Sequence, residues 1–336
     1  MAPWRRIGRW ANGDPSRAVL ALARMRRTVR ALAAALPALI SLDVHAEEGG
    51  SGHYLPGANA SFIDALPGRP GFAIANFFLY YPASTSRQLP IAGLITTRLD
   101  AKVYADSIVA IYQTSRELLG GSYAVGAVLP VVWMDVTASI APGPLNRSQD
   151  ENGIGDILFY PFMLGWKSLG GDLKYDVRLG IYAPTGKYEV GSLANLGRNY
   201  WTFEPAFTVS FLSSKIGLEA SAYAAVDFNT NNTATDYQTG TQFHIDATVA
   251  EHLPLLGGFV GAGASGFYYQ QVGGDSGSGA RLGDFKGHTL GVGPVVSYAI
   301  KSSGFDGAIE VKWLPEIDVK NRLEGDYLWI KIGAIF

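Results

Sequence analysis

The chain contains no cysteine, few charged residues and, after residue 46, no long apolar run. The lack of cysteine excludes disulfides, thiolate metal ligands and a cysteine nucleophile. Charged residues make up only 17% of the chain. A membrane-spanning helix needs roughly 20 consecutive apolar residues, and no segment after residue 46 approaches that length. If the chain spans a membrane, we therefore expect it to do so with β-strands.

Strand-forming residues dominate the composition. The chain has 41 Gly, 17 Tyr, 16 Phe and 7 Trp, and 48% of its residues are hydrophobic. This mixture is poor in helix formers and rich in residues that favour strands. The composition therefore predicts an all-β protein.

The first 46 residues are typical of a signal peptide. An apolar run at 31–42 follows a basic region, and the small residues up to Ala46 suit a signal peptidase. We expect cleavage after Ala46. Met25 is an alternative start, because a normal signal peptide could begin there. The adjacent Arg26 and Arg27 leave twin-arginine export as an alternative to the ordinary secretory route.

The mature chain is predicted to be acidic. The leader holds 8 Arg and 2 Asp, which leaves 19 basic and 27 acidic residues and a net charge near −8. Nucleic-acid binding favours a basic face, so this balance argues against a nucleic-acid partner.

Polar and apolar residues alternate along many segments of the mature chain. Lys174, Asp176 and Arg178 occupy alternate positions, with apolar or aromatic residues between them. A shift of one residue would turn three charges into lipid. This alternation is typical of outer-membrane strands, which direct apolar residues to lipid and polar residues inward.

The alternation predicts a transmembrane antiparallel up-and-down β-barrel over residues 71–336. We expect about 12 strands, and an even number places both termini in the periplasm. The long polar connectors 138–152, 185–199, 231–239 and 272–285 alternate with short ones and are expected outside the cell. A soluble β-sandwich is the alternative. The expected strands are 71–82, 98–114, 121–137, 153–166, 172–184, 200–212, 216–230, 240–252, 257–271, 286–300, 305–317 and 323–336.

Charged and polar residues of both signs fall on the faces expected to point inward. They could form a salt-bridge network that fills a narrow barrel, line a wet conduit, or do both. The expected pore-lining residues are Arg98, Asp100, Lys102, Asp106, Lys174, Asp176, Arg178, Glu204, Glu219, Asp227, His244, Asp246, Glu310, Lys312 and Lys331.

Residues 47–70 precede the first expected strand. Pro-Gly pairs at 56–57 and 67–68 flank a short segment that could form one or two helical turns. Two interpretations stay open, a plug folded into the lumen and a periplasmic tail.

The sequence offers little support for catalysis, a metal or a cofactor. No two of the histidines have the i, i+2 or i, i+4 spacing of a paired metal site. His244 lies beside Asp246 on one strand face. The two side chains could form a coupled pair, or His244 could be a solvated histidine of the pore. An outer-membrane lipase is the enzymatic alternative, because His288 falls on a lipid-facing position, but the His-Gly-Ser-Asn signature of that family is absent.

The chain ends in a strand of alternating apolar residues closed by Phe336. Such an ending resembles the insertion signal of outer-membrane proteins. We therefore expect the barrel-assembly machinery, membrane lipid and lipopolysaccharide as partners. Whether the barrel forms a homo-oligomer is left open.

Four stretches of the chain resemble a family named for the meta-pathway of phenol degradation. They are Ala183–Tyr188, Leu193–Pro205, His53–Gly57 and Gly153–Ile157. The resemblance extends over the mature chain and implies an outer-membrane barrel without established catalytic residues, related to pores that secrete functional amyloid. The residues of its shared motifs are Asp156, Pro184, Thr185, Gly186, Gly197, Asn199, Trp201 and Pro205.

The resemblance and the strand pattern together predict a passive channel for small hydrophobic or aromatic solutes. A polypeptide-secretion pore and a structural outer-membrane protein are the alternatives. A secretion pore needs a gate and a wide wet lumen, whereas a channel for hydrophobic solutes needs an apolar pocket.

Overall fold

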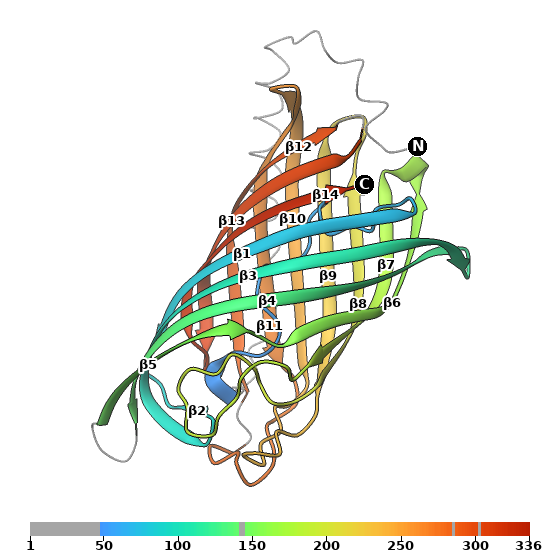
Figure 1. The fold of residues 1–336 in the computed structure, drawn as a ribbon. Coiled ribbons are helices and arrows are strands. Elements are labelled where there is room, and N and C mark those ends of the chain that lie inside the picture. The colour runs from blue at the N-terminus through green and yellow to red at the C-terminus, as the bar shows by residue number, and fades with distance from the viewer. Residues whose placement is uncertain (1–47, 141–144, 284–285, 302–303) are drawn as a thin grey trace.

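The computed structural model describes residues 48–140, 145–283, 286–301 and 304–336, so the expected signal peptide lies outside the described residues. In this part of the chain, twelve antiparallel strands form a closed barrel (Figure 1). The barrel strands are β1 (Gly71–Thr85), β3 (Leu94–Leu118), β4 (Gly121–Ile140), β6 (Ile157–Ser168), β7 (Leu173–Ala183), β8 (Thr202–Leu212), β9 (Leu218–Asn229), β10 (Gln242–Leu255), β11 (Gly258–Gln271), β12 (His288–Lys301), β13 (Asp306–Lys320) and β14 (Glu324–Ile335).

Pairing of the first and last barrel strands closes the sheet. Ala73 of β1 is opposite Ile335 of β14, and β1 also pairs with β3 along its whole length. Within the described residues, no helix is long and apolar enough to cross a membrane. The prediction of an all-β antiparallel barrel with about 12 strands is confirmed.

The prediction of a loop at 138–152 was wrong. β4 continues to Ile140, and β5 (Leu145–Ile154) pairs back along it, with Leu145 opposite Ile140. Most of the expected loop is therefore a hairpin, and the next barrel strand begins at Ile157 rather than at residue 153. Both faces of β5 are polar over most of its length, so backbone pairing holds this strand without a hydrophobic alternation that sequence could reveal.

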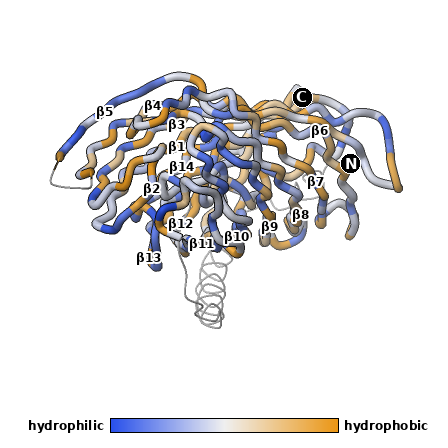
Figure 2. The backbone as a smooth tube through the Cα atoms, turned by 90° about the horizontal axis from the view of Figure 1, so that it is seen from below, coloured by the Kyte–Doolittle hydropathy of each residue, from blue (hydrophilic) through white to orange (hydrophobic). Residues whose placement is uncertain are grey.

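The strands alternate between an apolar outer face and a buried inner face. On β8, Phe203 and Phe207 are 40% and 47% exposed, whereas Glu204 and Thr208 are 2% and 3% exposed. Figure 2 shows this alternation of hydrophobic and hydrophilic residues along the strands. A closed sheet with exposed aromatic residues outside satisfies its backbone hydrogen bonds internally and offers lipid an apolar surface.

The connectors differ between the two ends of the barrel. At the lower end in Figure 1, here called the long-loop end, lie the connectors 184–201, 230–241 and the one that contains β2 (Leu89–Ile91). At the other, short-turn end, β3 and β4 are joined by residues 119–120, and β6 and β7 by a stretch that contains the 3-10 turn η3 (Leu169–Gly171).

Val177→Arg tests the assignment of the outer face. Val177 lies mid-strand on β7, opposite the exposed Phe207 of β8. An arginine facing the bilayer midplane costs about 2–4 kcal/mol in such barrels. We expect urea unfolding in lipid vesicles to show this loss of stability.

Val190→Arg is the matched control, because Val190 is exposed in connector 184–201 outside the wall. This variant should be as stable as the parent chain. Equal stability of both variants would contradict the assigned strand register.

Candidate functional site

Residues 48–70 run through the interior of the barrel from the long-loop end to the short-turn end. The segment begins with the 3-10 turn η2 (Glu48–Gly50) and leads into β1 at Gly71. Figure 1 shows its first residues among the loops of the long-loop end. An irregular segment in such a place must find partners for its backbone N–H and C=O groups. Inward-facing side chains of the barrel supply many of them.

Long connectors hold the start of the segment. Tyr188 and Asn232 donate hydrogen bonds to the two carboxylate oxygens of Glu48, at 3.1 and 3.2 Å. Burial raises the pKa of Glu48 above its usual range, and burial raises the pKa of Tyr188 to about 12. The carboxylate is therefore held by hydrogen bonds in a place that water hardly reaches.

His53 connects the segment to the barrel wall. Its ring nitrogens lie 2.8 Å from the Asp156 carboxylate and 2.7 Å from the Thr202 hydroxyl. The same carboxylate accepts the backbone N–H groups of Gly186 and Arg198, at 2.9 and 2.6 Å. Asp156 thus ties together the segment and connector 184–201.

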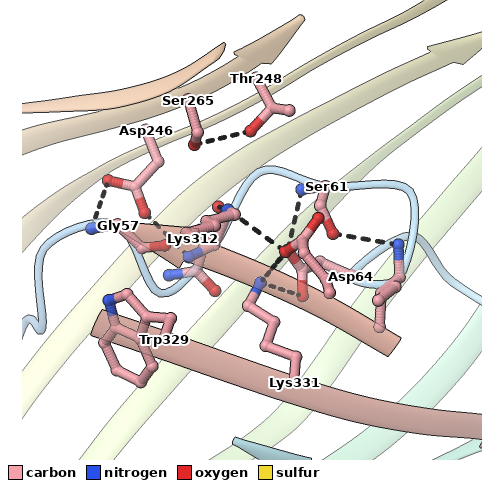
Figure 3. A network of polar contacts seen from close by, with 12 residues as sticks. Gly57, Ser61, Asp64, Asp246, Thr248, Ser265, Lys312, Trp329 and Lys331 are labelled. Carbon is pink, nitrogen blue, oxygen red and sulfur yellow. Dashed lines mark hydrogen bonds and ion pairs between the residues drawn. The ribbon is translucent and has the colours of Figure 1, made fainter. Parts of the chain in front are cut away.

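Asp246 and Lys312 hold the middle of the segment (Figure 3). Asp246 accepts hydrogen bonds from the Tyr54 hydroxyl and from the backbone N–H of Asn59, the latter at 2.9 Å. Lys312 donates to the carbonyl oxygens of Gly57 and Asn59, at 3.3 and 2.8 Å. One carboxylate and one ammonium therefore satisfy opposite kinds of backbone group in the same turn.

Lys331 and Glu219 hold the next stretch. The Lys331 ammonium lies 3.1 and 3.0 Å from the two carboxylate oxygens of Asp64, as Figure 3 shows. Glu219 accepts the backbone N–H of Phe62 at 2.8 Å. Both Lys331 and Glu219 are almost fully buried. Buried charges need several polar partners, and the segment supplies one to each of them beside Glu310 and His252 of the wall.

The short-turn end holds the last residues of the segment. Lys174 donates to the carbonyl of Leu66 at 3.2 Å, and Gln113 accepts the N–H of Gly68 at 2.7 Å.

Most of the expected inward residues do point into the barrel. All of them are buried except Lys174, which is half-buried. Several of these side chains hold residues 48–70. Others pair with one another, as Arg178 does with Asp176 at 2.7 Å. The inward residues are Lys174, Asp176, Arg178, Glu204, Glu219, Asp227, His244, Asp246, Glu310, Lys312 and Lys331.

The prediction for β3 was wrong. Arg98, Asp100, Lys102 and Asp106 lie on the outer face, where Arg98 pairs with Asp100 at 3.0 Å and Asp106 accepts a hydrogen bond from Asn76. The residues between them point inward instead, and Leu99, Ala101 and Ala105 are buried. The inner face of β3 lines the apolar cavity, and because alternate residues of a strand point to opposite faces, the charged positions between these residues lie outside.

An apolar cavity of about 290 Å³ lies between the N-terminal segment and the wall formed by β1, β3 and β4. Sequence reasoning missed it, although its signal was present in strands that carry apolar residues on both faces. The wall is lined by Ala73, Ala75, Phe77, Leu79 and Tyr81 of β1, by Leu99, Ala101, Val103, Ala105, Ser107, Val109 and Ile111 of β3, and by Val128, Pro130, Val132, Met134 and Val136 of β4.

The family-motif residues shape connector 184–201. Thr185 accepts the N–H of Ile157 at 2.9 Å, and its hydroxyl donates to the carbonyl of Gly155 at 3.0 Å. A Cβ added at Gly186 would lie 2.7 Å from Gly197, so only glycine allows this close approach.

The remaining motif residues lie around the same connector. Asn199 adopts a left-handed backbone (φ 59°) and donates to Asn232 at 2.7 Å. Pro184 directly follows β7, and Trp201 and Pro205 are exposed on the outer face. These four residues do not line the cavity, whereas the motif residues Asp156 and Gly197 do.

The fold resembles that of solved outer-membrane proteins. An outer membrane channel from Pseudomonas putida F1 superposes with a TM-score of 0.59 and 16% identity over 81% of this chain and 97% of that chain. The β-domain of the Bordetella autotransporter BrkA gives a TM-score of 0.45 and 14% identity over 80% of this chain and 99% of that chain. The second similarity is too weak to support a comparison. No curated protein matches the chain.

The sequence pattern of one family, described as "Putative MetA-pathway of phenol degradation", matches residues 68–332. This range covers all twelve barrel strands apart from the last residues of β14. The closed sheet and its apolar outer face are those of a protein of the bacterial outer membrane. The chain is an outer-membrane β-barrel that belongs to the family with this description.

Proposed function

We propose that the barrel is an outer-membrane channel that admits small hydrophobic solutes, aromatic ones included, by passive diffusion. The observation that carries this proposal is the apolar cavity between residues 48–64 and the β1–β3–β4 wall. In this proposal the long-loop end faces the cell exterior, because outer-membrane barrels place their longer loops there.

The size and the apolar wall of the cavity suit a single small aromatic molecule. An engineered apolar cavity of about 150 Å³ in another protein binds benzene. The cavity here measures about 290 Å³. Its β1–β3–β4 wall is almost wholly aliphatic and aromatic, whereas Glu48, Asp64 and Arg178 are among the residues that line its other side. Transfer of an apolar solute from water to such a wall is favourable, roughly in proportion to the apolar area buried.

In this proposal, the charged side of the interior makes the channel selective against ions. The inward charges of β7 to β14 are occupied by residues 48–70 or by one another, as Lys312 and Lys331 illustrate. A small ion entering the barrel would therefore meet few open charged groups and would lose hydration along the apolar wall. We expect low conductance for ions and sugars beside measurable flux of phenol or toluene.

A polypeptide-secretion pore is disfavoured by the same geometry. Residues 48–70 occupy the interior, and an unfolded chain could pass only after they leave. A structural role without transport remains the competing outcome of the flux experiments.

Val103→Thr with Val132→Thr tests the apolar wall. Both side chains line the cavity, and the change keeps their volume while it adds two buried hydroxyl groups. In liposomes containing the purified mature protein, toluene flux should fall several-fold.

The control for the wall variant is Val296→Thr, which makes the same change on the outer face. It should leave flux unchanged. Equal flux for all three proteins would contradict a solute path along this wall.

Deletion of residues 47–66 tests how far the segment fills the interior. Removal leaves Asp246, Lys312 and Lys331 without their bound segment, so water should replace it. We expect single-channel conductance in planar bilayers to rise several-fold over that of the full mature chain.

A folded deletion variant with unchanged conductance would show that the segment does not limit ion passage. Heat modifiability on gels confirms folding before the recording. If deletion also abolishes the preference for toluene over sugars, both walls of the cavity take part in selection.

A further inference from the structure

Three buried side chains with metal-binding groups converge on neighbouring strands. Glu204 of β8, Asp227 of β9 and His244 of β10 are each at most 2% exposed, and one ligand atom of each lies within 4.8 Å of the others. Each is the third residue from the long-loop end of its strand. They form the one group of this composition found among the described residues.

The two distances from His244 to the carboxylates match the edges of a metal coordination sphere. His244 Nε2 lies 3.5 Å from Glu204 Oε2 and 3.5 Å from Asp227 Oδ1. Tetrahedral coordination at roughly 2.0–2.2 Å per ligand separates neighbouring ligand atoms by about 3.4 Å. Nε2 of His244 thus faces both carboxylates, whereas its Nδ1 has no hydrogen-bond partner among the described residues.

Tyrosines around the cluster hold the ligands in position. Tyr223 donates a hydrogen bond to Glu204 Oε1, which leaves Oε2 directed toward His244, and Tyr182 donates to Oε2 at 3.4 Å. The ring of Tyr54 stacks on the His244 imidazole with 3.7 Å between centroids. Outer contacts of this kind orient ligands in metal sites.

Charge balance also favours a cation. The cluster holds two carboxylates and one imidazole, so even a protonated imidazole leaves it with one formal negative charge. Buried charge of one sign is costly, and a divalent ion neutralises both carboxylates while the imidazole stays neutral. The alternative without metal is an imidazolium held between the two carboxylates.

We propose that Glu204, Asp227 and His244 bind a divalent transition-metal ion of the Zn²⁺ class. One nitrogen and two carboxylate oxygens suit such an ion, and a fourth position stays open to water. The bound ion fixes the imidazole on which Tyr54 packs, and thereby helps to hold the N-terminal segment inside the barrel. This site stands independently of the proposed solute path.

Metal binding by the complete mature barrel tests the proposal. The refolded protein is freed of metal with a chelator and then dialysed against Zn²⁺ or Co²⁺. We expect one ion per chain, and the Co²⁺ form should show the visible absorption of a tetrahedral N/O site. A folded protein that binds neither ion overturns the proposal and leaves the imidazolium triad.

Variants separate this site from adventitious surface binding. His244→Ala and Glu204→Gln should each weaken binding by about 100-fold or more. His252→Ala is the matched control, because His252 is equally buried but pairs with Glu219 at 2.7 Å, outside the cluster. This control should keep one ion per chain. Undiminished binding by folded His244→Ala would overturn the proposed site.

Discussion

The interior of this barrel depends on hydrogen bonds between inward charged side chains and the backbone of residues 48–70. A segment without regular structure can be buried only if its N–H and C=O groups find partners. Asp246 and Glu219 accept N–H groups, Lys312 and Lys174 donate to carbonyls, and Lys331 binds Asp64. The same contacts compensate the burial of these charges, which would otherwise destabilise the barrel.

This pairing divides the interior into two halves. The strands that carry charges bind the segment, and the side of the segment turned away from them faces β1, β3 and β4. That opposite wall is mostly apolar, and its Gln113 accepts the N–H of Gly68 at the short-turn end. A cavity suited to hydrophobic solutes therefore follows from the way in which the segment is held. The colours of Figure 1 show that β1, β3 and β4 come early in the chain and that β8 to β14 come late.

The strands could be predicted because lipid outside and a packed interior impose a period of two. The rule fails where its physical premise fails. β5 is polar on both faces over most of its length, so it was predicted as a loop. Leu99, Ala101 and Ala105 face an apolar interior, so the predicted inward face of β3 was wrong. The cluster of Glu204, Asp227 and His244 joins separate strands, so no local spacing reveals it. The cavity has a local sign only in the strands that carry apolar residues on both faces.

Hydrogen–deuterium exchange of the folded protein in a lipid bilayer tests the central claim most directly. The claim is that inward charges hold the backbone of residues 54–66. The amides of Asn59 and Phe62, bonded to Asp246 and Glu219, should then exchange about as slowly as amides of the barrel strands. Exchange at the rate of an unfolded peptide would show that the segment is not bound inside and would contradict this account of the interior.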